Sequence, residues 1–292
     1  MIGSVLTAMV TPFDESGAVD WTTAAELMHH LVDHGSDGLV LSGTTGESPT
    51  LTDEEKIALF RLGVSEVGDR ASIVAGTGSN DTAHSVHLTE AAHAAGVDAV
   101  LAVTPYYNKP PREGLLGHFG AIAAVGAPVI LYNIPGRCVI NMGPDLIAEI
   151  SRIPGVVGIK EANPDRAHMN AVSKIDDLLF YAGNDDTFID ALELGGAGVI
   201  SVASHLVGPQ MVRIWQAAAD GDLDTARELD RELHDLYAGL FITANPILVK
   251  AALQMLGMLP TSTLRLPLVE ATPVQRDILA TVLDRQGILA SS

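Results

Sequence analysis

The sequence predicts an α/β fold, a (β/α)8 or TIM barrel followed by a C-terminal helical extension. Short apolar runs alternate along the chain with amphipathic stretches whose apolar residues recur at three- and four-residue spacing. Strands that alternate with helices form parallel βαβ units with right-handed crossovers. Eight apolar runs within roughly 200 residues match the strand count of a closed barrel. A doubly wound open sheet is the main structural alternative.

Eight runs are expected to form strands, at residues 4–10, 38–41, 72–75, 99–103, 129–132, 156–160, 179–182 and 198–201. The helical pattern between them is clear at residues 22–34, 53–67, 82–94, 112–124 and 187–194, and 206–219 is expected to be the last barrel helix. Residues 222–240, 246–256 and 273–284 then predict consecutive helices without strands. We therefore assign residues 1–221 to the barrel, which would carry a catalytic site, and 222–292 to a helical extension without a separate function.

The composition indicates a cytoplasmic protein with one large domain. The 292 residues are 47% hydrophobic, yet no apolar run approaches the ~18 residues that span a membrane. The first residues lack the basic leader of a signal peptide, and the single cysteine, Cys138, excludes an internal disulfide framework. The formal charge of −19 would repel nucleic acid and anionic lipid, so we expect neither as a partner.

A lysine marks the expected catalytic rim, because barrel enzymes place their active sites at the carboxyl ends of the strands. Lys160 ends the apolar run 156–160, which contains no other charge. Burial at the mouth of a barrel lowers the pKa of a lysine and frees the amine to attack a ketone. The alternative is a lysine that merely reaches solvent at a strand end.

Two further groups would face such a lysine. Tyr132 ends the neighbouring strand, ~4.8 Å away, and its phenol could shuttle protons during imine formation; a packing role is the alternative. The loop Gly43-Thr44-Thr45-Gly46 follows the second strand, on the opposite wall of the barrel. Its backbone and hydroxyl groups could bind the carboxylate of a keto acid, although an ordinary helix-capping loop before Asp53 would look similar.

Other candidates give weaker signals. Tyr106 and Tyr107 form a conspicuous pair in a chain with only 4% aromatic residues, and Arg137 could bind a second carboxylate or form a surface ion pair. The segment 184–186, Asn-Asp-Asp, could ligate a cation, but a helix-capping role is favoured. His84 and His87 share a helix face without a third ligand, and the segment 76–78 lacks a complete dinucleotide motif, so we expect no metal and no cofactor.

Five motifs in order resemble the dihydrodipicolinate synthase family, within the wider N-acetylneuraminate lyase superfamily. They are Gly-Thr-Thr-Gly-Glu at 43–47, Thr-Pro-Tyr-Tyr-Asn at 104–108, Tyr-Asn-Ile-Pro at 132–135, Gly-Ile-Lys-Glu at 158–161 and Asn-Pro at 245–246. The resemblance covers nearly the whole chain. One departure is Cys138-Val139, where the family often has threonine and glycine.

The resemblance implies a condensation of pyruvate with aspartate semialdehyde, a step toward diaminopimelate and lysine. Lys160 would carry the pyruvate imine, and Tyr132 would exchange protons through Thr44 with Tyr107, which the family borrows from a neighbouring subunit. A homotetramer built as a dimer of dimers would follow. The substrate-binding residues implied are Thr45 for the pyruvate carboxylate, Arg137 for the carboxylate of the semialdehyde, and the pocket-lining backbone of Ile200, Gly183 and Asn184.

Two other functions stay open on the sequence. An N-acetylneuraminate lyase or a 2-keto-3-deoxy sugar acid aldolase would use the same lysine and tyrosine. Sialic acid lyases commonly carry serine-threonine in the first loop and usually lack the arginine after Tyr-x-x-Pro, so the double threonine and Arg137 favour the synthase. A non-catalytic binding barrel is the remote alternative.

Overall fold

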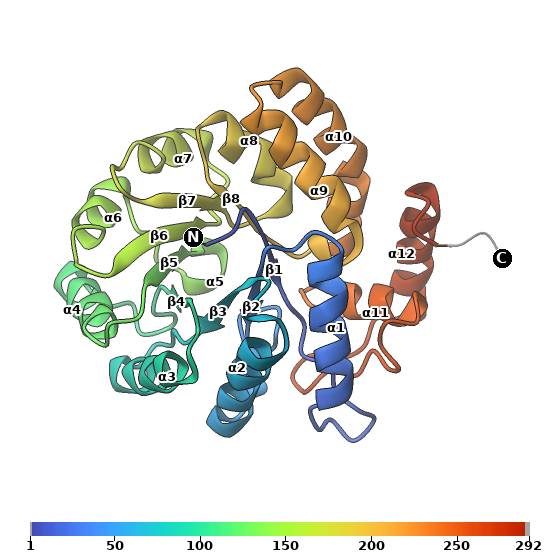
Figure 1. The fold of residues 1–292 in the computed structure, drawn as a ribbon, viewed down its shortest axis with the longest axis horizontal. Coiled ribbons are helices and arrows are strands. Elements are labelled where there is room, and N and C mark those ends of the chain that lie inside the picture. The colour runs from blue at the N-terminus through green and yellow to red at the C-terminus, as the bar shows by residue number, and fades with distance from the viewer. Residues whose placement is uncertain (1, 290–292) are drawn as a thin grey trace.

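A closed, eight-stranded parallel barrel forms the centre of the protein. The computed structural model describes residues 2–289. Each strand pairs with its neighbours in chain order, and the last strand closes the barrel against the first (Figure 1). This closure confirms the predicted barrel and excludes the open sheet. The strands are β1 Val5–Ala8, β2 Gly38–Leu41, β3 Ser72–Gly76, β4 Ala99–Val103, β5 Val129–Asn133, β6 Val156–Glu161, β7 Leu179–Ala182 and β8 Gly198–Ser201.

Helices surround the barrel. Those that connect successive strands are α1 Trp21–Asp33, α2 Asp53–Val67, α3 Thr82–Ala95, α4 Arg112–Ala123, α6 Pro144–Ile150, α7 Arg166–Val172 and α8 Phe188–Glu193, and α9 Ser204–Ala219 follows β8. Side chains that accept a hydrogen bond from the first helical turn begin α1, α2 and α3, namely those of Asp20, Thr52 and Asp81. Short helical turns lie in three strand-to-helix loops, η1 Ser48–Thr50, α5 Pro135–Cys138 and η2 Asp185–Thr187.

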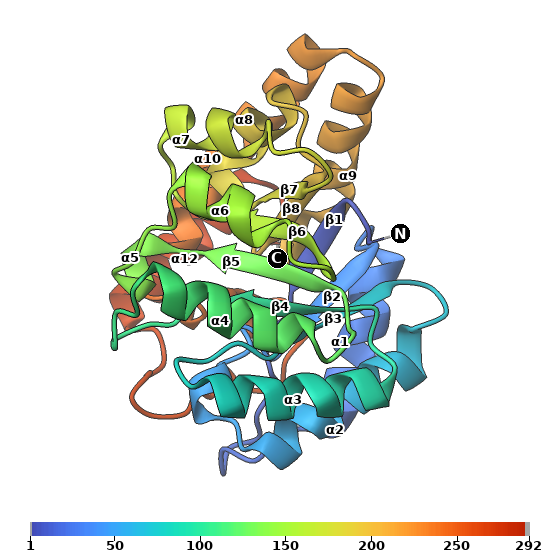
Figure 2. The ribbon, with the colours of Figure 1, turned by 90° about the vertical axis from the view of Figure 1, so that its left-hand side faces the viewer.

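The C-terminal segment adds three helices outside this ring, α10 Leu223–Leu240, α11 Ile247–Met255 and α12 Pro273–Arg285. Helix α10 packs against α9, and α12 contacts both α10 and α11. Figure 1 shows α11 and α12 on the same side of the barrel as α1, and Figure 2 shows the strands from the side. The long predicted helices of this segment are confirmed to within about a residue at each end.

The helices differ most from the prediction where they are short. The expected helix at 187–194 is α8, which follows the short turn η2 directly, and α6 and α7 were not predicted individually. Each of α6 and α7 has seven residues, which is about two turns and too short for a helical period to stand out. Helix α9 begins at Ser204 and has a non-helical residue, Val207, two positions before Pro209.

The apolar core has two layers. Inward-facing side chains of alternate strand positions fill the barrel, among them Leu6, Val40, Val74, Ile130 and Ile200. The larger layer fills the space between the strands and the surrounding helices. Burying one such aliphatic side chain contributes about 1.5–3 kcal/mol to folding. Tyr132 belongs to the inner cluster, so its ring stands on the packed interior of the barrel.

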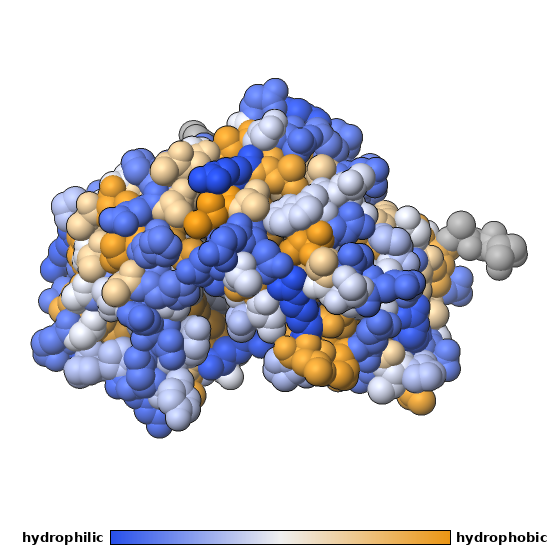
Figure 3. Space-filling view, turned by 90° about the horizontal axis from the view of Figure 1, so that it is seen from below, coloured by the Kyte–Doolittle hydropathy of each residue, from blue (hydrophilic) through white to orange (hydrophobic). Residues whose placement is uncertain are grey.

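The surface carries many hydrophilic side chains (Figure 3). The face of the molecule in Figure 3 is mostly hydrophilic, with hydrophobic patches between the polar side chains. Within residues 2–289, no helix combines the length and the apolar character needed to cross a membrane.

Candidate active site

Lys160 and Tyr132 lie side by side at the carboxyl ends of β6 and β5. The two residues are partners in the register of the parallel pair. The Lys160 Nζ lies 4.6 Å from the centroid of the Tyr132 ring. Both side chains are buried, with exposed fractions of 6% and 5%. The structure thus brings together the two residues on which the predicted imine chemistry depends.

Burial changes the acidity of Lys160. Loss of hydration lowers the pKa of its amine to about 8, the Asp185 carboxylate acts in the opposite direction, and the Arg137 guanidinium lowers the pKa further. With that pKa, about one amine in ten is neutral at pH 7, against about one in 3000 for an unperturbed lysine. The neutral amine is the form that attacks a carbonyl carbon.

The pKa of Lys160 leads to a pH prediction. The rate at which a keto acid forms an adduct on Lys160 should rise with pH and level off above about 8. In Asp185→Asn, the carboxylate that raises the pKa is gone, so the midpoint should move to lower pH. Single-turnover trapping with borohydride at a series of pH values measures this midpoint.

Asp186→Asn is the matched control, because this exposed neighbour carries the same charge and does not act on Lys160. We expect its midpoint to equal that of the unmodified protein. A midpoint that stays in place or rises in Asp185→Asn would contradict the assignment.

Tyr132 is held as a neutral phenol. Burial raises the pKa of its hydroxyl, while the Arg137 guanidinium and a hydrogen bond with Thr44 lower it. The backbone amide and the side-chain hydroxyl of Thr104 both donate to the Tyr132 carbonyl, each at 2.9 Å, and this fixes the end of β5. A neutral phenol beside a second hydroxyl can both donate and accept a proton.

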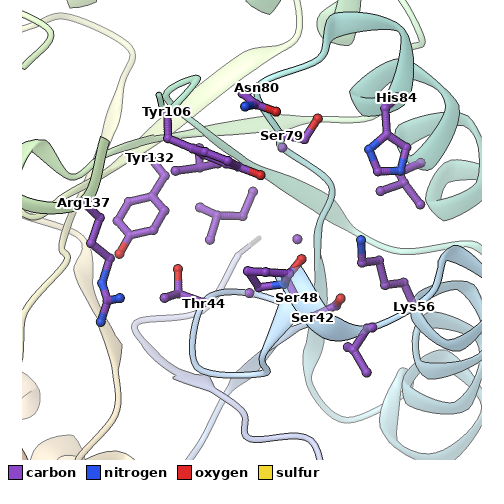
Figure 4. Close-up of a pocket in the computed structure, with 18 of the residues that line it drawn as sticks. Ser42, Thr44, Ser48, Lys56, Ser79, Asn80, His84, Tyr106, Tyr132 and Arg137 are labelled. Atoms are coloured by element: carbon purple, nitrogen blue, oxygen red, sulfur yellow. The ribbon is translucent and has the colours of Figure 1, made fainter. Parts of the chain in front are cut away.

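A cavity of about 430 Å³ opens beside these residues. Thr44, Tyr106, Tyr132 and Arg137 contribute to its lining. In Figure 4, Tyr132, Arg137 and Thr44 lie on one side of the cavity, with Lys56 and His84 on the other. Residues at the ends of β2, β3, β4 and β5 therefore line this cavity. Lys160, near the end of β6 and beside Tyr132, is not among the lining residues.

The far side of the cavity is a polar cluster centred on Asp53. The Asp53 carboxylate contacts the His84 Nε2 at 2.9 Å and the Lys56 Nζ at 3.7 Å. The hydroxyl of Ser42, also in the lining, is buried without a hydrogen-bond partner in the described part of the chain. The loop 43–47 precedes α2, which begins at Asp53. The side chains of this loop do not cap α2, because the cap is the side chain of Thr52.

The loop after β7 binds to its neighbours through its backbone and through Asp185. The Gly183 amide donates to the Glu161 carbonyl at 2.7 Å, and a Cβ at this position would lie 2.7 Å from the same oxygen, so only glycine fits. The Asp185 carboxylate accepts hydrogen bonds from the Ser201 hydroxyl at 2.5 Å and the Ala203 amide at 3.0 Å. Asp185 therefore joins this loop to the end of β8 and to the start of α9, and it does not cap the helix that follows it in the chain.

The remaining predicted residues are distributed around this rim. Ile200 is buried in the barrel interior, and Thr45 is buried in the loop after β2. Asn184 lines a second cavity, together with Asp186 and His234, and, like Lys160, it is not in the lining of the first. Tyr107 is 87% exposed and is absent from the lining of the described cavity.

A buried polar network on the outer side of the same strands was not predicted. The Glu161 carboxylate, fully buried, accepts from the Asn133 amide at 2.9 Å and contacts the His168 Nε2 at 3.0 Å. Asn133 and Glu161 are paired in register directly after Tyr132 and Lys160. Strand alternation could have identified them, because residues next to inward-facing catalytic groups point outward toward the helices.

Among residues 2–289, no group of three or more His, Cys, Asp or Glu side chains is arranged to hold a metal ion. Cys138 is buried, and burial raises the pKa of its thiol to about 11, so the reactive thiolate is disfavoured.

Comparisons with known proteins agree with this geometry. The model of the "Dihydrodipicolinate synthetase family" matches residues 1–286. The 4-hydroxy-tetrahydrodipicolinate synthase of Heliobacterium modesticaldum is 48% identical over 99% of this chain and 97% of its own length.

Solved structures extend the likeness to three dimensions. The synthase of Cyanidioschyzon merolae, crystallised with lysine bound, superposes with a TM-score of 0.96 at 40% identity, over 99% of both chains. The chloride-inhibited synthase of Acinetobacter baumannii, in complex with pyruvate, gives a TM-score of 0.96 at 36% identity, over 99% of this chain and 100% of its own. The chain belongs to the dihydrodipicolinate synthetase family.

Proposed function

We propose that this protein is a Schiff-base-forming lyase that condenses pyruvate with aspartate 4-semialdehyde. Its product is 4-hydroxy-tetrahydrodipicolinate, on the route to diaminopimelate and lysine. The near-complete coverage of relatives with that activity supports this function. The observation that carries it is the buried Lys160 amine, with a pKa of about 8, next to the Tyr132 phenol.

The first half of the reaction forms a nucleophile on the lysine. The neutral Lys160 amine attacks the keto carbon of pyruvate, and loss of water leaves an imine. Tyr132 supplies and takes up the protons that addition and dehydration require, and it exchanges them with the neighbouring Thr44 hydroxyl. The imine then loses a proton from the pyruvate methyl group and becomes an enamine. Thr45 holds the pyruvate carboxylate.

The second half forms the carbon–carbon bond and releases the enzyme. The enamine carbon attacks the aldehyde of the second substrate, whose carboxylate binds the Arg137 guanidinium at the mouth of the cavity. The amino group of that substrate then attacks the imine carbon, the ring closes, and the Lys160 amine leaves. The backbone of Ile200, Gly183 and Asn184 completes the pocket in this proposal.

A substrate comparison tests the function. We expect the purified protein to consume pyruvate when aspartate semialdehyde is added, in an assay that detects the cyclic product after reduction. N-Acetylneuraminate and 2-keto-3-deoxy sugar acids should not be cleaved at a comparable rate. Retro-aldol cleavage of these acids without turnover of the semialdehyde would identify a sugar acid aldolase instead.

The proton relay requires a second copy of the chain. Tyr107 has a left-handed backbone conformation, with φ of 73°, and projects its ring into solvent. An exposed tyrosine beside a reactive cavity is well placed to enter the cavity of a neighbour. We therefore propose that Tyr107 completes the site of an adjacent subunit, in a homotetramer built as a dimer of dimers. One neighbour in structure is described as a monomeric variant, so this assembly needs its own test.

Subunit complementation distinguishes the two arrangements. Lys160→Ala and Tyr107→Phe should each be nearly inactive alone. When they are unfolded and refolded together, a mixed dimer contains one site with an intact Lys160 and an intact Tyr107 from the other chain, so activity should return. If Tyr107 serves its own chain, both sites of the mixed dimer are defective and the mixture stays inactive.

The proposal also includes the role of the C-terminal helical extension and the cellular location of the protein. Residues 222–292 would belong to the same catalytic unit as the barrel, residues 1–221, with no separate function. A cytoplasmic location is part of the proposal and fits an enzyme of amino-acid biosynthesis.

A further inference from the structure

The loop between β2 and α2 has a conformation that needs support from outside. It carries Thr44 and Thr45, and it ends at Glu47, a non-glycine residue with φ of 57°. Such a left-handed residue persists only where surrounding contacts hold it in place. Within the loop, the Glu47 amide donates to the Thr44 carbonyl at 3.1 Å, and the Thr11 hydroxyl donates to the Gly46 carbonyl at 2.7 Å.

The C-terminal extension binds the end of this loop through a buried ion pair. The Lys250 Nζ, on α11, donates to the Glu47 carboxylate at 2.6 Å and to the Thr263 carbonyl at 2.8 Å. The Arg265 amide donates to the other carboxylate oxygen of Glu47 at 3.1 Å. Both partners of the ion pair are almost fully buried. The three other residues in this group of contacts, Lys250, Thr263 and Arg265, all belong to the C-terminal extension.

A second contact reaches the loop where substrate would bind. Asn245, two residues before the start of α11, donates from its side-chain amide to the Thr45 hydroxyl oxygen at 2.8 Å. Both residues are buried, with exposed fractions of 8% and 3%. A hydroxyl that accepts a hydrogen bond at its oxygen keeps its own proton free for another acceptor. Within residues 2–289, no protein acceptor for that proton is recorded.

We propose that Asn245 is a positioning residue that orients the Thr45 hydroxyl to donate to the substrate carboxylate, and that the C-terminal extension thereby forms part of the active site. The inference rests on the proposed function, in which Thr45 holds the carboxylate of pyruvate. The Lys250–Glu47 pair fixes the loop, and the Asn245 amide sets the direction of the hydroxyl proton. Asn245 and Thr45, 200 positions apart in the chain, thus act together in binding the substrate carboxylate.

Asn245→Asp tests the direction of this hydrogen bond. A carboxylate of the same size can only accept, so it would draw the Thr45 proton away from the substrate. We expect the pyruvate concentration for half-maximal borohydride trapping on Lys160 to rise about ten- to hundredfold, the range of a hydrogen bond to a charged group. The extent of trapping at saturating pyruvate should change little. Asn245→Ala should give a smaller rise.

A double-mutant cycle separates orientation from simple charge repulsion. In Thr45→Val there is no hydroxyl to orient, so adding Asn245→Asp to it should cause little further loss. Gln254→Glu is the matched control, because it makes the same amide-to-acid change on α11 at a side chain that contacts Arg276 and not the loop. Its half-saturating concentration should be unchanged.

Three outcomes would overturn the inference. They are normal pyruvate affinity in a folded Asn245→Asp protein, an equal loss in the Thr45→Val background, or an equal loss in Gln254→Glu. Thermal unfolding of each variant shows whether it folds, and Asn245→Ala serves if Asn245→Asp does not. Failure of the unmodified protein to form any pyruvate adduct would instead reject the proposed function, so the two failures are distinguishable.

Discussion

Lys160→Ala is expected to lose at least about 10⁴-fold in turnover of pyruvate and aspartate semialdehyde, on the scale seen when an enzyme loses its covalent nucleophile. No other lysine can replace it, because the reaction needs an amine with a lowered pKa that is buried beside Tyr132. Steady-state kinetics over a wide range of enzyme concentration measures the loss. The variant should fold, since the Lys160 amine has no ion pair among the described residues.

Lys174→Ala is the control for this prediction. Lys174 is exposed and follows α7, away from the strand ends that form the site. We expect it to retain full turnover. Residual activity in Lys160→Ala within about tenfold of the unmodified protein would mean that the reaction does not proceed through an imine on this residue.

Lys250→Met is expected to lower the free energy of unfolding by about 3–5 kcal/mol, the usual cost of removing one partner of a buried ion pair. The methionine is similar in length, but it leaves the Glu47 carboxylate buried without its cation. The Nζ also lies 4.1 Å from the centroid of the Phe13 ring, and this contact is lost as well. Denaturant unfolding followed by circular dichroism measures the change.

Two variants make this prediction specific. Lys174→Met removes an exposed lysine and should change the free energy of unfolding by less than about 0.5 kcal/mol. The double variant Lys250→Met, Glu47→Gln removes the uncompensated charge, so it should recover part of the loss. A Lys250→Met protein as stable as Lys174→Met would show that the pair does not hold the extension against the loop.

Local patterns along the chain predicted the barrel, and they placed Lys160 and Tyr132 side by side at its rim. Alternating strands and helices fixed the order of the elements, and Lys160 and Tyr132 could be recognised because each ends an apolar strand. Neighbouring strands of a parallel barrel align their carboxyl ends, so adjacency along the sheet followed from chain order. The four-residue α5 and the seven-residue α7 lack enough turns to display a period.

Contacts between distant segments could not be predicted in the same way. The Asn-Pro motif at 245–246 was recognised as a family feature, but nothing in its local sequence indicates that Asn245 bonds to Thr45. The contacts of Asp185 were not predicted, because its partners, Ser201 and Ala203, belong to the next strand and its loop. Such pairs depend on how the extension and the loops pack, which is a property of the whole fold.

Borohydride reduction of the unmodified protein with pyruvate, followed by intact mass and peptide mapping, tests the central claim most directly. Reduction fixes an imine as a stable secondary amine. We expect one adduct per chain, with the mass of reduced pyruvate, on the peptide that contains Lys160, and none in Lys160→Ala. A folded, assembled protein that forms no adduct, or an adduct on another lysine, would contradict an imine on Lys160 and leave a binding barrel as the better description.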